Sequence, residues 1–192
     1  MTAHGRSRLL IAVAGALVLM LAAATACTNK KPTGALPSPI PASASPTPSV
    51  DPSVANAEQL ARAAYAGYIQ TWATASQQAD PDNPDLARYV ADPLLSLTRH
   101  NIRWLKDIGA VQVGAQKATV LDVQVNLATK PPTVTITSCL DYSELRLVYR
   151  SNQSPVPNSG GGDPKVPAVA TMWLYQTGQW LVNNSKQGSH TC

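Results

Sequence analysis

Apolar residues recur at helical spacing in the segment that follows residue 54. Asn56, followed three residues later by Gln59, is typical of a helix start, and we expect this helix to run to about Ala79. The Asp and Pro residues at 80–84 end it. The apolar residues of this helix form one stripe, which consists of Ala61, Tyr65, Tyr68, Trp72 and Ala75. An apolar stripe on a helix is more often part of a protein core than of a ligand site.

Two further helices are expected before the pattern changes. A short helix covers about residues 85–91. A longer one starts at Asp92 and Pro93, with the proline in its first turn, and stops at Gly109. The residues that this longer helix is expected to bury are Leu94, Leu97, Ile102, Leu105 and Ile108.

From residue 118 onward the pattern has the period of two that is typical of a half-buried β-strand. In residues 118–128 one predicted face carries Leu121, Val123, Val125 and Leu127, and the other carries Val120, Asp122, Gln124 and Asn126. In residues 133–140 one face carries Val134, Ile136, Ser138 and Leu140. Further strands are expected at 144–150, 168–176 and 179–184, and the last two meet in a turn at Thr177 and Gly178.

Helices followed by an antiparallel meander predict an α+β fold for residues 54–192. We expect the N-terminal helices to pack on one face of a strongly bent, mainly antiparallel sheet. A chain of this length buries roughly two thirds of the surface that its unfolded form exposes, which is enough for a single domain.

The N-terminus has a different character. Arg6 and Arg8 precede an apolar run, and this order is typical of a secretory signal peptide. The run ends in the sequence Ala-Thr-Ala-Cys, which resembles the bacterial lipobox, although Ala24 stands where a leucine is usual. The resemblance implies that a diacylglyceryl group is attached to Cys27 and that residues 1–26 are removed. The alternatives are an uncleaved transmembrane anchor and ordinary secretion without a lipid.

Residues 27–53 form the expected link between the lipidated cysteine and the domain. Seven prolines lie here among Ser, Thr and Ala, a composition that cannot build a core and stays extended. The sequence therefore predicts a spacer that holds the domain off the extracytoplasmic face of the cell membrane, with the lipid anchor as the contact to the membrane.

The net charge of the domain bears on whether its partner is a nucleic acid. The whole chain has a formal net charge of +4, but residues 54–192 contain 11 Lys and Arg against 10 Asp and Glu, a difference of +1. A nucleic-acid-binding protein needs a concentrated basic face, so no nucleic-acid partner is expected.

Three cysteines occur, and lipidation of Cys27 leaves Cys139 and Cys192 as an even pair. In an exported protein this pair is expected to form a disulfide, and two free thiols are the alternative. His100, His190 and the cysteines lack the paired spacing of a zinc site, so neither a metal nor a cofactor is expected.

The order of elements resembles the nuclear transport factor 2-like superfamily, to which ketosteroid isomerase belongs. The resemblance extends from residue 54 to about residue 185, and many exported actinobacterial lipoproteins share this layout. Its more telling points are Gly109 at the end of the helical part, Cys139-Leu140-Asp141 at a strand end, and residues 178–182 (Gly-Gln-Trp-Leu-Val) in the last strand. A cystatin-like or other helix-on-sheet domain is the alternative.

The resemblance implies a cone whose open end holds an apolar pocket. The candidates to line it are Tyr65, Tyr68, Trp72, Trp104 and Tyr142. The alternative is that these side chains fill the cone, because aromatic residues bury large areas with or without a ligand. The absence of phenylalanine from the chain favours that alternative, since Tyr and Trp must supply all aromatic packing.

Enzymes of this superfamily use a carboxylate or a His–Asp pair in the cone, which makes Asp141 and His100 the candidate catalytic residues. Their alternatives are a turn residue for Asp141 and a surface residue for His100. The first hypothesis is therefore a non-enzymatic, lipid-anchored protein that binds an envelope protein or a small apolar ligand. The second is a lipid-anchored isomerase or dehydratase, and the third is a purely structural or antigenic surface domain.

Overall fold

The structure is a computed structural model that describes residues 51–159 and 163–192. The predicted signal peptide, the lipid site at Cys27 and nearly all of the predicted spacer lie outside the described residues. Residues 47–192 form one compact unit, and its buried core residues all lie between Ala57 and Val182. A fragment that begins at residue 47 therefore contains the complete core. None of the helices in the described ranges is long and apolar enough to cross a membrane.

The first helix, α1 (Pro52–Gln78), begins earlier than the expected start at Asn56. Asp51 caps it, because the Asp51 carboxylate accepts a hydrogen bond from the backbone N–H of Ser53 at 2.8 Å. Pro52 occupies the first turn, where its missing N–H costs nothing. The helix ends as expected, since Ala79 adopts a left-handed conformation with φ of 49° and its N–H bonds back to the last turn.

Two shorter helices follow, α2 (Leu86–Tyr89) and α3 (Leu94–Asp107). Leu94, Ile102 and Leu105 of α3 are buried as predicted. The prediction for Leu97 is wrong, because its side chain is 54% exposed. Leu97 is one turn from Leu94 but lies at the edge of the buried stripe, where it lines a cavity between α3 and the sheet.

The strands form two antiparallel sheets instead of the single sheet that the sequence predicts. One contains β2 (Lys117–Asn126), β3 (Thr133–Asp141), β5 (Lys165–Leu174) and β6 (Trp180–Gln187) in the order β2-β3-β5-β6. The other pairs β1 (Ala110–Val113) with β4 (Arg146–Tyr149). The sequence reading missed β1, because four residues are too few to display a period of two.

The predicted faces of β2 are partly wrong. A β-bulge between Val120 and Asp122 shifts the register against β3 by one residue. One extra residue reverses the alternation of side chains, so Val120 packs against the core together with Val123 and Val125. Leu121, which was expected beside Val123 and Val125, is 53% exposed.

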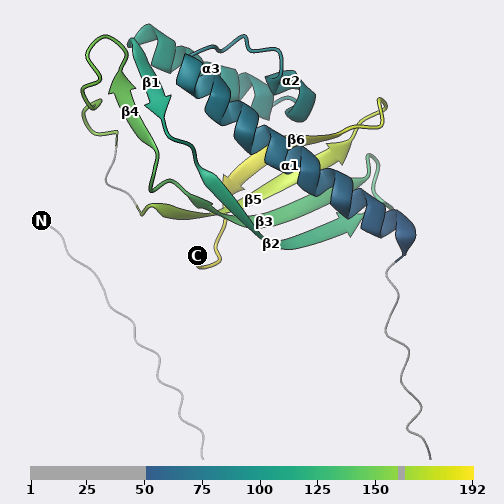
Figure 1. Ribbon diagram of the computed structural model, residues 1–192. Helices are drawn as coiled ribbons and strands as arrows, with labels where there is room; N and C mark the ends of the chain where they lie inside the picture. Colours follow the sequence, from purple (N-terminus) through teal and green to yellow (C-terminus); the bar gives the residue numbers. More distant parts are fainter. Residues whose placement is uncertain (1–50, 160–162) are drawn as a thin grey trace, which may run out of the picture. The chain divides into compact units, whose positions relative to one another are not determined.

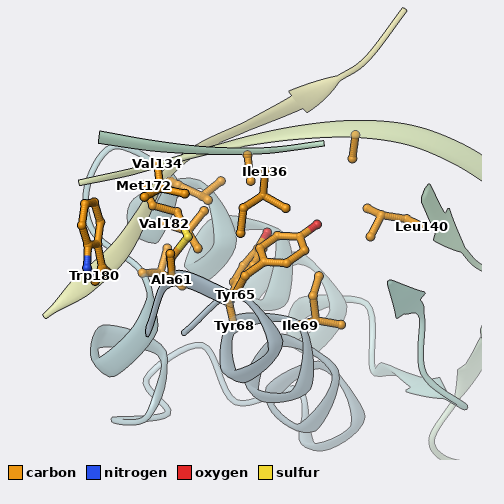
Figure 2. Packing of buried hydrophobic residues seen from close by; sticks show 14 of the residues in the cluster. Ala61, Tyr65, Tyr68, Ile69, Val134, Ile136, Leu140, Met172, Trp180 and Val182 are labelled. Atoms are coloured by element: carbon orange, nitrogen blue, oxygen red, sulfur yellow. The ribbon is translucent and has the colours of Figure 1, made fainter. Parts of the chain in front are cut away.

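The helices cover one face of the four-stranded sheet, and α1 lies across it (Figure 1). Buried side chains of β3, β5 and β6 face α1, as Figure 2 shows for Ile136, Met172 and Val182. Burial in β3 alternates strictly, with Val134, Ile136, Ser138 and Leu140 inside. The expected α+β arrangement, with N-terminal helices packed on one face of an antiparallel sheet, is confirmed.

Candidate functional site

A cavity of about 410 Å³ lies where α1 and α3 meet the small β1–β4 sheet. Its apolar lining comes from both helices, from β4 and from the segment before β4, and comprises Trp72, Trp104, Leu105, Tyr142, Leu145 and Leu147. Its polar lining comes from α1, α3 and β1, and comprises Ser76, His100, Asn101 and Gln112. A volume of this size is within the range of pockets that bind small molecules, which are also mainly apolar with a few polar groups.

A second cavity of about 220 Å³ adjoins the first. Trp72, Asn101 and Tyr142 line both cavities, so the two spaces meet at these three side chains. The second cavity continues along α3 past Leu94 and Thr98 toward the ends of β5 and β6. Together they form a groove between α3 and the sheets.

The five aromatic residues proposed from the sequence divide between core and cavity. Trp72, Trp104 and Tyr142 line the first cavity, and Tyr68 joins Trp72 and Tyr142 in lining the second. Tyr65 lines neither of these two cavities and is only 1% exposed, so it fills the core. One end of the aromatic row is therefore part of the packed core, and the other end lines open space.

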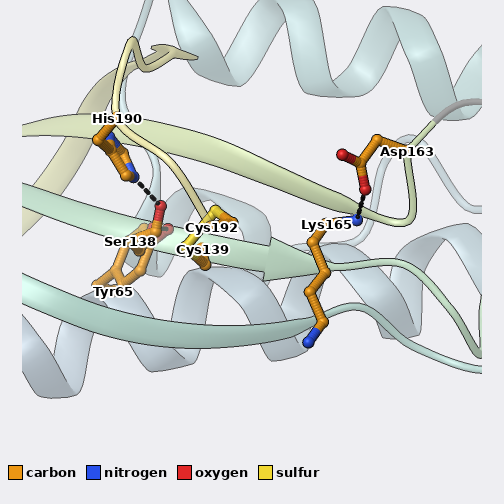
Figure 3. Close-up of a disulfide and its surroundings, with 7 residues drawn as sticks. All are labelled: Tyr65, Ser138, Cys139, Asp163, Lys165, His190 and Cys192. Carbon is orange, nitrogen blue, oxygen red and sulfur yellow. Dashed lines mark hydrogen bonds between the residues drawn. A yellow bond between two sulfur atoms is a disulfide. The ribbon is translucent and has the colours of Figure 1, made fainter.

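These aromatic rings are held in a fixed arrangement by α1. Tyr68 stacks on Trp72, with 6.0 Å between ring centroids and 7° between planes, and Tyr65 lies tilted beside Tyr68 at 6.1 Å. The Tyr65 hydroxyl is hydrogen-bonded to Ser138 Oγ at 2.8 Å (Figure 3). Burial raises the pKa of the Tyr65, Tyr68 and Tyr142 phenols, which keeps all three neutral. The wall between core and cavity is thus aromatic and uncharged.

Trp104 stands at the rim of the first cavity. Its side chain is 48% exposed, although α3 is a strongly amphipathic helix and a tryptophan could bury far more surface. His100 lies one turn earlier on the same helix and also lines the cavity. An exposed tryptophan beside a concave apolar surface is the kind of side chain that a ligand covers.

The structure does not bring the two proposed catalytic residues together. Asp141 lines neither of the two cavities that meet at Trp72, whereas His100 lines the first. The Asp141 carboxylate accepts hydrogen bonds from the Ser143 hydroxyl and, at 2.9 Å, from the Ser143 backbone N–H. These bonds hold the pKa of the Asp141 carboxyl below its usual range. A general acid needs the opposite shift, and the bonds to Ser143 fit the turn role that was the alternative for Asp141.

Three polar residues of the cavity, Ser76, Asn101 and Gln112, were missed from the sequence. Gln112 lies on the undetected strand β1 and is 6% exposed. Its Nε2 donates to the backbone oxygen of Gly114 at 3.0 Å and to Gln116 Oε1 at 3.4 Å. Ser76, on the last turns of α1, is also buried. The sequence offered one indication of Gln112, because it is the single polar residue in the short apolar run that follows Gly109.

The structure joins Cys139 and Cys192 in the expected disulfide, with 5.7 Å between their Cα atoms (Figure 3). The C-terminal tail reaches Cys139 by crossing β5, where the N–H of Gly188 donates to the carbonyl of Pro167 at 2.9 Å. His190 Nε2 lies 3.0 Å from the carbonyl oxygen of Ser138. The two sulfurs and one ring nitrogen of His190 all lie within 4.8 Å of one another. Sulfurs engaged in a disulfide are not thiolate ligands, so this cluster does not offer a zinc site in the oxidised protein.

No protein-family model matches the chain, and no curated protein matches it in sequence. Among solved structures it is similar to the intermembrane space region of the chloroplast protein ARC6, at 12% identity over 73% of this chain and 98% of that one, with a TM-score of 0.40. A conserved protein from Planctomyces limnophilus DSM 3776 is 16% identical over 68% and 94% of the two chains, with a TM-score of 0.39. A protein assigned as a polyketide cyclase from Xanthomonas campestris pv. campestris is 15% identical over 64% and 90%, with a TM-score of 0.29. These likenesses carry no function over to this chain.

Proposed function

We propose that this chain is a lipid-anchored, extracytoplasmic binding protein whose α+β domain, of the nuclear transport factor 2-like type, binds a small apolar ligand between α1, α3 and the β1–β4 sheet. The observation that carries the proposal is the cavity of about 410 Å³ with Trp72, Trp104 and Tyr142 in its lining. The order of helices and strands supports the fold type.

The pattern of buried and exposed apolar side chains supports a binding role for the cavity over a role in core packing alone. The core is complete without Trp104, because Tyr65 and its neighbours already fill the space between α1 and the sheet. Trp104 and Leu97 of α3 stay exposed on the side where the two cavities open to one another. A ligand seated there would cover apolar surface that the protein itself leaves in contact with water.

The cavity is less suited to acid–base catalysis. Of the described residues that line it, His100 and Tyr142 are the titratable ones, and none is a carboxylate. Burial raises the pKa of the Tyr142 phenol, which makes it a weaker acid. Binding is therefore the function that these side chains support best.

Ligand binding can be tested with N-phenyl-1-naphthylamine, an uncharged dye that fluoresces in apolar sites. The fragment 47–192 should bind it saturably, and Trp104→Ala should weaken binding about tenfold, because the variant removes one aromatic wall. Leu60→Ala is the matched control, since Leu60 is an exposed apolar residue of α1 that belongs to neither cavity. Equal binding by Trp104→Ala and the wild type, or no saturable binding at all, would contradict the proposal.

The anchoring part of the proposal rests on the sequence of residues 6–27. Replacing the sulfur in Cys27→Ser removes the only atom of that segment to which a diacylglyceryl group can be attached. In cells that make the full chain, the variant should leave the washed membrane fraction or keep its signal peptide, as judged by immunoblot size and fractionation. A variant that is processed normally and still sediments with membranes would show that the anchor is elsewhere.

A further inference from the structure

The lining of the first cavity is polar in places but contains no permanently charged side chain. Its polar members are Ser76, His100, Asn101 and Gln112, and Asp, Glu, Lys and Arg do not occur among the described residues that line it. This is unusual for the surface of a domain in which charged residues are otherwise spread over every helix and most strands. A lining without charged side chains favours a ligand that is itself uncharged.

A charged ligand group would enter this cavity at a cost. It would lose part of its hydration, and no permanently charged side chain of opposite sign is available in the lining of this cavity to replace the water. An uncharged polar group needs only hydrogen bonds, which the amides of Asn101 and Gln112 can form. The lining therefore favours uncharged ligands over charged ligands of the same shape.

Gln112 sets the direction of one of these hydrogen bonds. Because its Nε2 is occupied by the Gly114 carbonyl and by Gln116 Oε1, its Oε1 is the part left to accept a bond. None of the hydrogen bonds between the described residues has this oxygen as its acceptor. A ligand that fits Gln112 thus carries an N–H or O–H donor.

We propose that the cavity selects an uncharged, planar aromatic ligand with one hydrogen-bond donor. The aromatic side chains of Trp72, Trp104 and Tyr142 would contact the planar ring of the ligand, and Gln112 would accept the hydrogen bond from its donor group. This inference rests on the proposed function, because it names the class of ligand for the same cavity.

Three probes with the same ring test the charge selection at pH 7 by titration calorimetry on the fragment 47–192. They are 2-naphthol, which is neutral and has a donor, 2-naphthoate, which is an anion, and 2-(aminomethyl)naphthalene, which is a cation. We expect 2-naphthol to bind at least about tenfold more tightly than either charged probe. A charged probe that binds as tightly as 2-naphthol would overturn the inference. If N-phenyl-1-naphthylamine still binds, the proposed function stands without this refinement, and if it does not, the proposed function fails first.

A single substitution should weaken the selection against a cation. Asn101→Asp places a carboxylate at the junction of the two cavities with almost no change in side-chain size. Its affinity for 2-(aminomethyl)naphthalene should rise about fivefold, while its affinity for 2-naphthol stays within twofold of the wild type. Asn184→Asp is the control, because Asn184 is an exposed residue of β6 outside both cavities. An equal gain in the control, or none in Asn101→Asp, would show that Asn101 does not face the ligand.

Discussion

The hydroxyl of Tyr65 explains the one polar residue on the inner face of β3. Ser138 is fully buried in a row with Val134, Ile136 and Leu140, where an apolar residue would ordinarily stand. The chain has no phenylalanine, so tyrosine fills the core and brings a hydroxyl that must be satisfied. Ser138 meets that need across 73 residues of sequence.

Tyr65→Phe should lower the free energy of unfolding by about 1–2 kcal/mol, because it leaves the buried Ser138 hydroxyl without its partner. Urea unfolding of the fragment 47–192 measures the change. The pair Tyr65→Phe and Ser138→Ala should cost less than the sum of the two single variants. Strict additivity would mean that the two hydroxyls do not interact.

At the scale of elements, β1 depends on a glycine at each end. Gly109 and Gly114 both have positive φ, 68° and 76° respectively, a backbone conformation that glycine adopts without strain. They differ in their surroundings. A Cβ on Gly109 would meet nothing within 4 Å, whereas one on Gly114 would collide with the backbone carbonyl of Glu144. That close approach sets the chain between β1 and β2 against the segment before β4, and so shapes the wall that holds Gln112.

Gly114→Ala should therefore destabilise the domain by at least about 3 kcal/mol, which combines backbone strain with a clash that side-chain motion cannot relieve. Gly109→Ala is the matched control and should cost only about 1 kcal/mol, the strain alone. Thermal or urea unfolding distinguishes them. Equal losses in the two variants would contradict the packing assigned to Gly114.

On the scale of the whole molecule, the disulfide joins the end of the chain to the middle of the sheet. Cys139 and Cys192 are separated by 53 residues, and the tail between Gly188 and Cys192 contributes no residue to the hydrophobic core. The tail is therefore held by the disulfide, by one backbone hydrogen bond and by the His190 contact. Most of the stabilisation should come from restricting the unfolded chain.

Reduction should lower the free energy of unfolding by about 4 kcal/mol, as the loss of a closed loop of this length predicts. The measurement is the urea midpoint of the fragment 47–192 with and without a thiol reductant. The double variant Cys139→Ala/Cys192→Ala should match the reduced protein and should not respond to the reductant. A wild-type midpoint that the reductant leaves unchanged would mean that the bond does not restrain the unfolded state.

Several features followed from local sequence alone. The end of α1, the limits of α2 and α3, the inner face of β3 and the turn at Gly178 were all predicted, because each reflects periodicity or backbone preference within a few residues. The pairing of Cys139 with Cys192 followed from parity once Cys27 was set aside.

The cavity was decided only by tertiary structure. Its lining combines Trp72 of α1, Trp104 of α3, Gln112 of β1 and Tyr142 before β4, and no periodicity within one segment reports how far apart two packed segments come to rest. For the same reason the sequence named three of its aromatic residues but could not separate them from Tyr65, which has the same chemistry and is sealed in the core. Aromatic spacing determined that α1 has a buried face, and the crossing of α3 over the β1–β4 sheet determined which part of that face stays open.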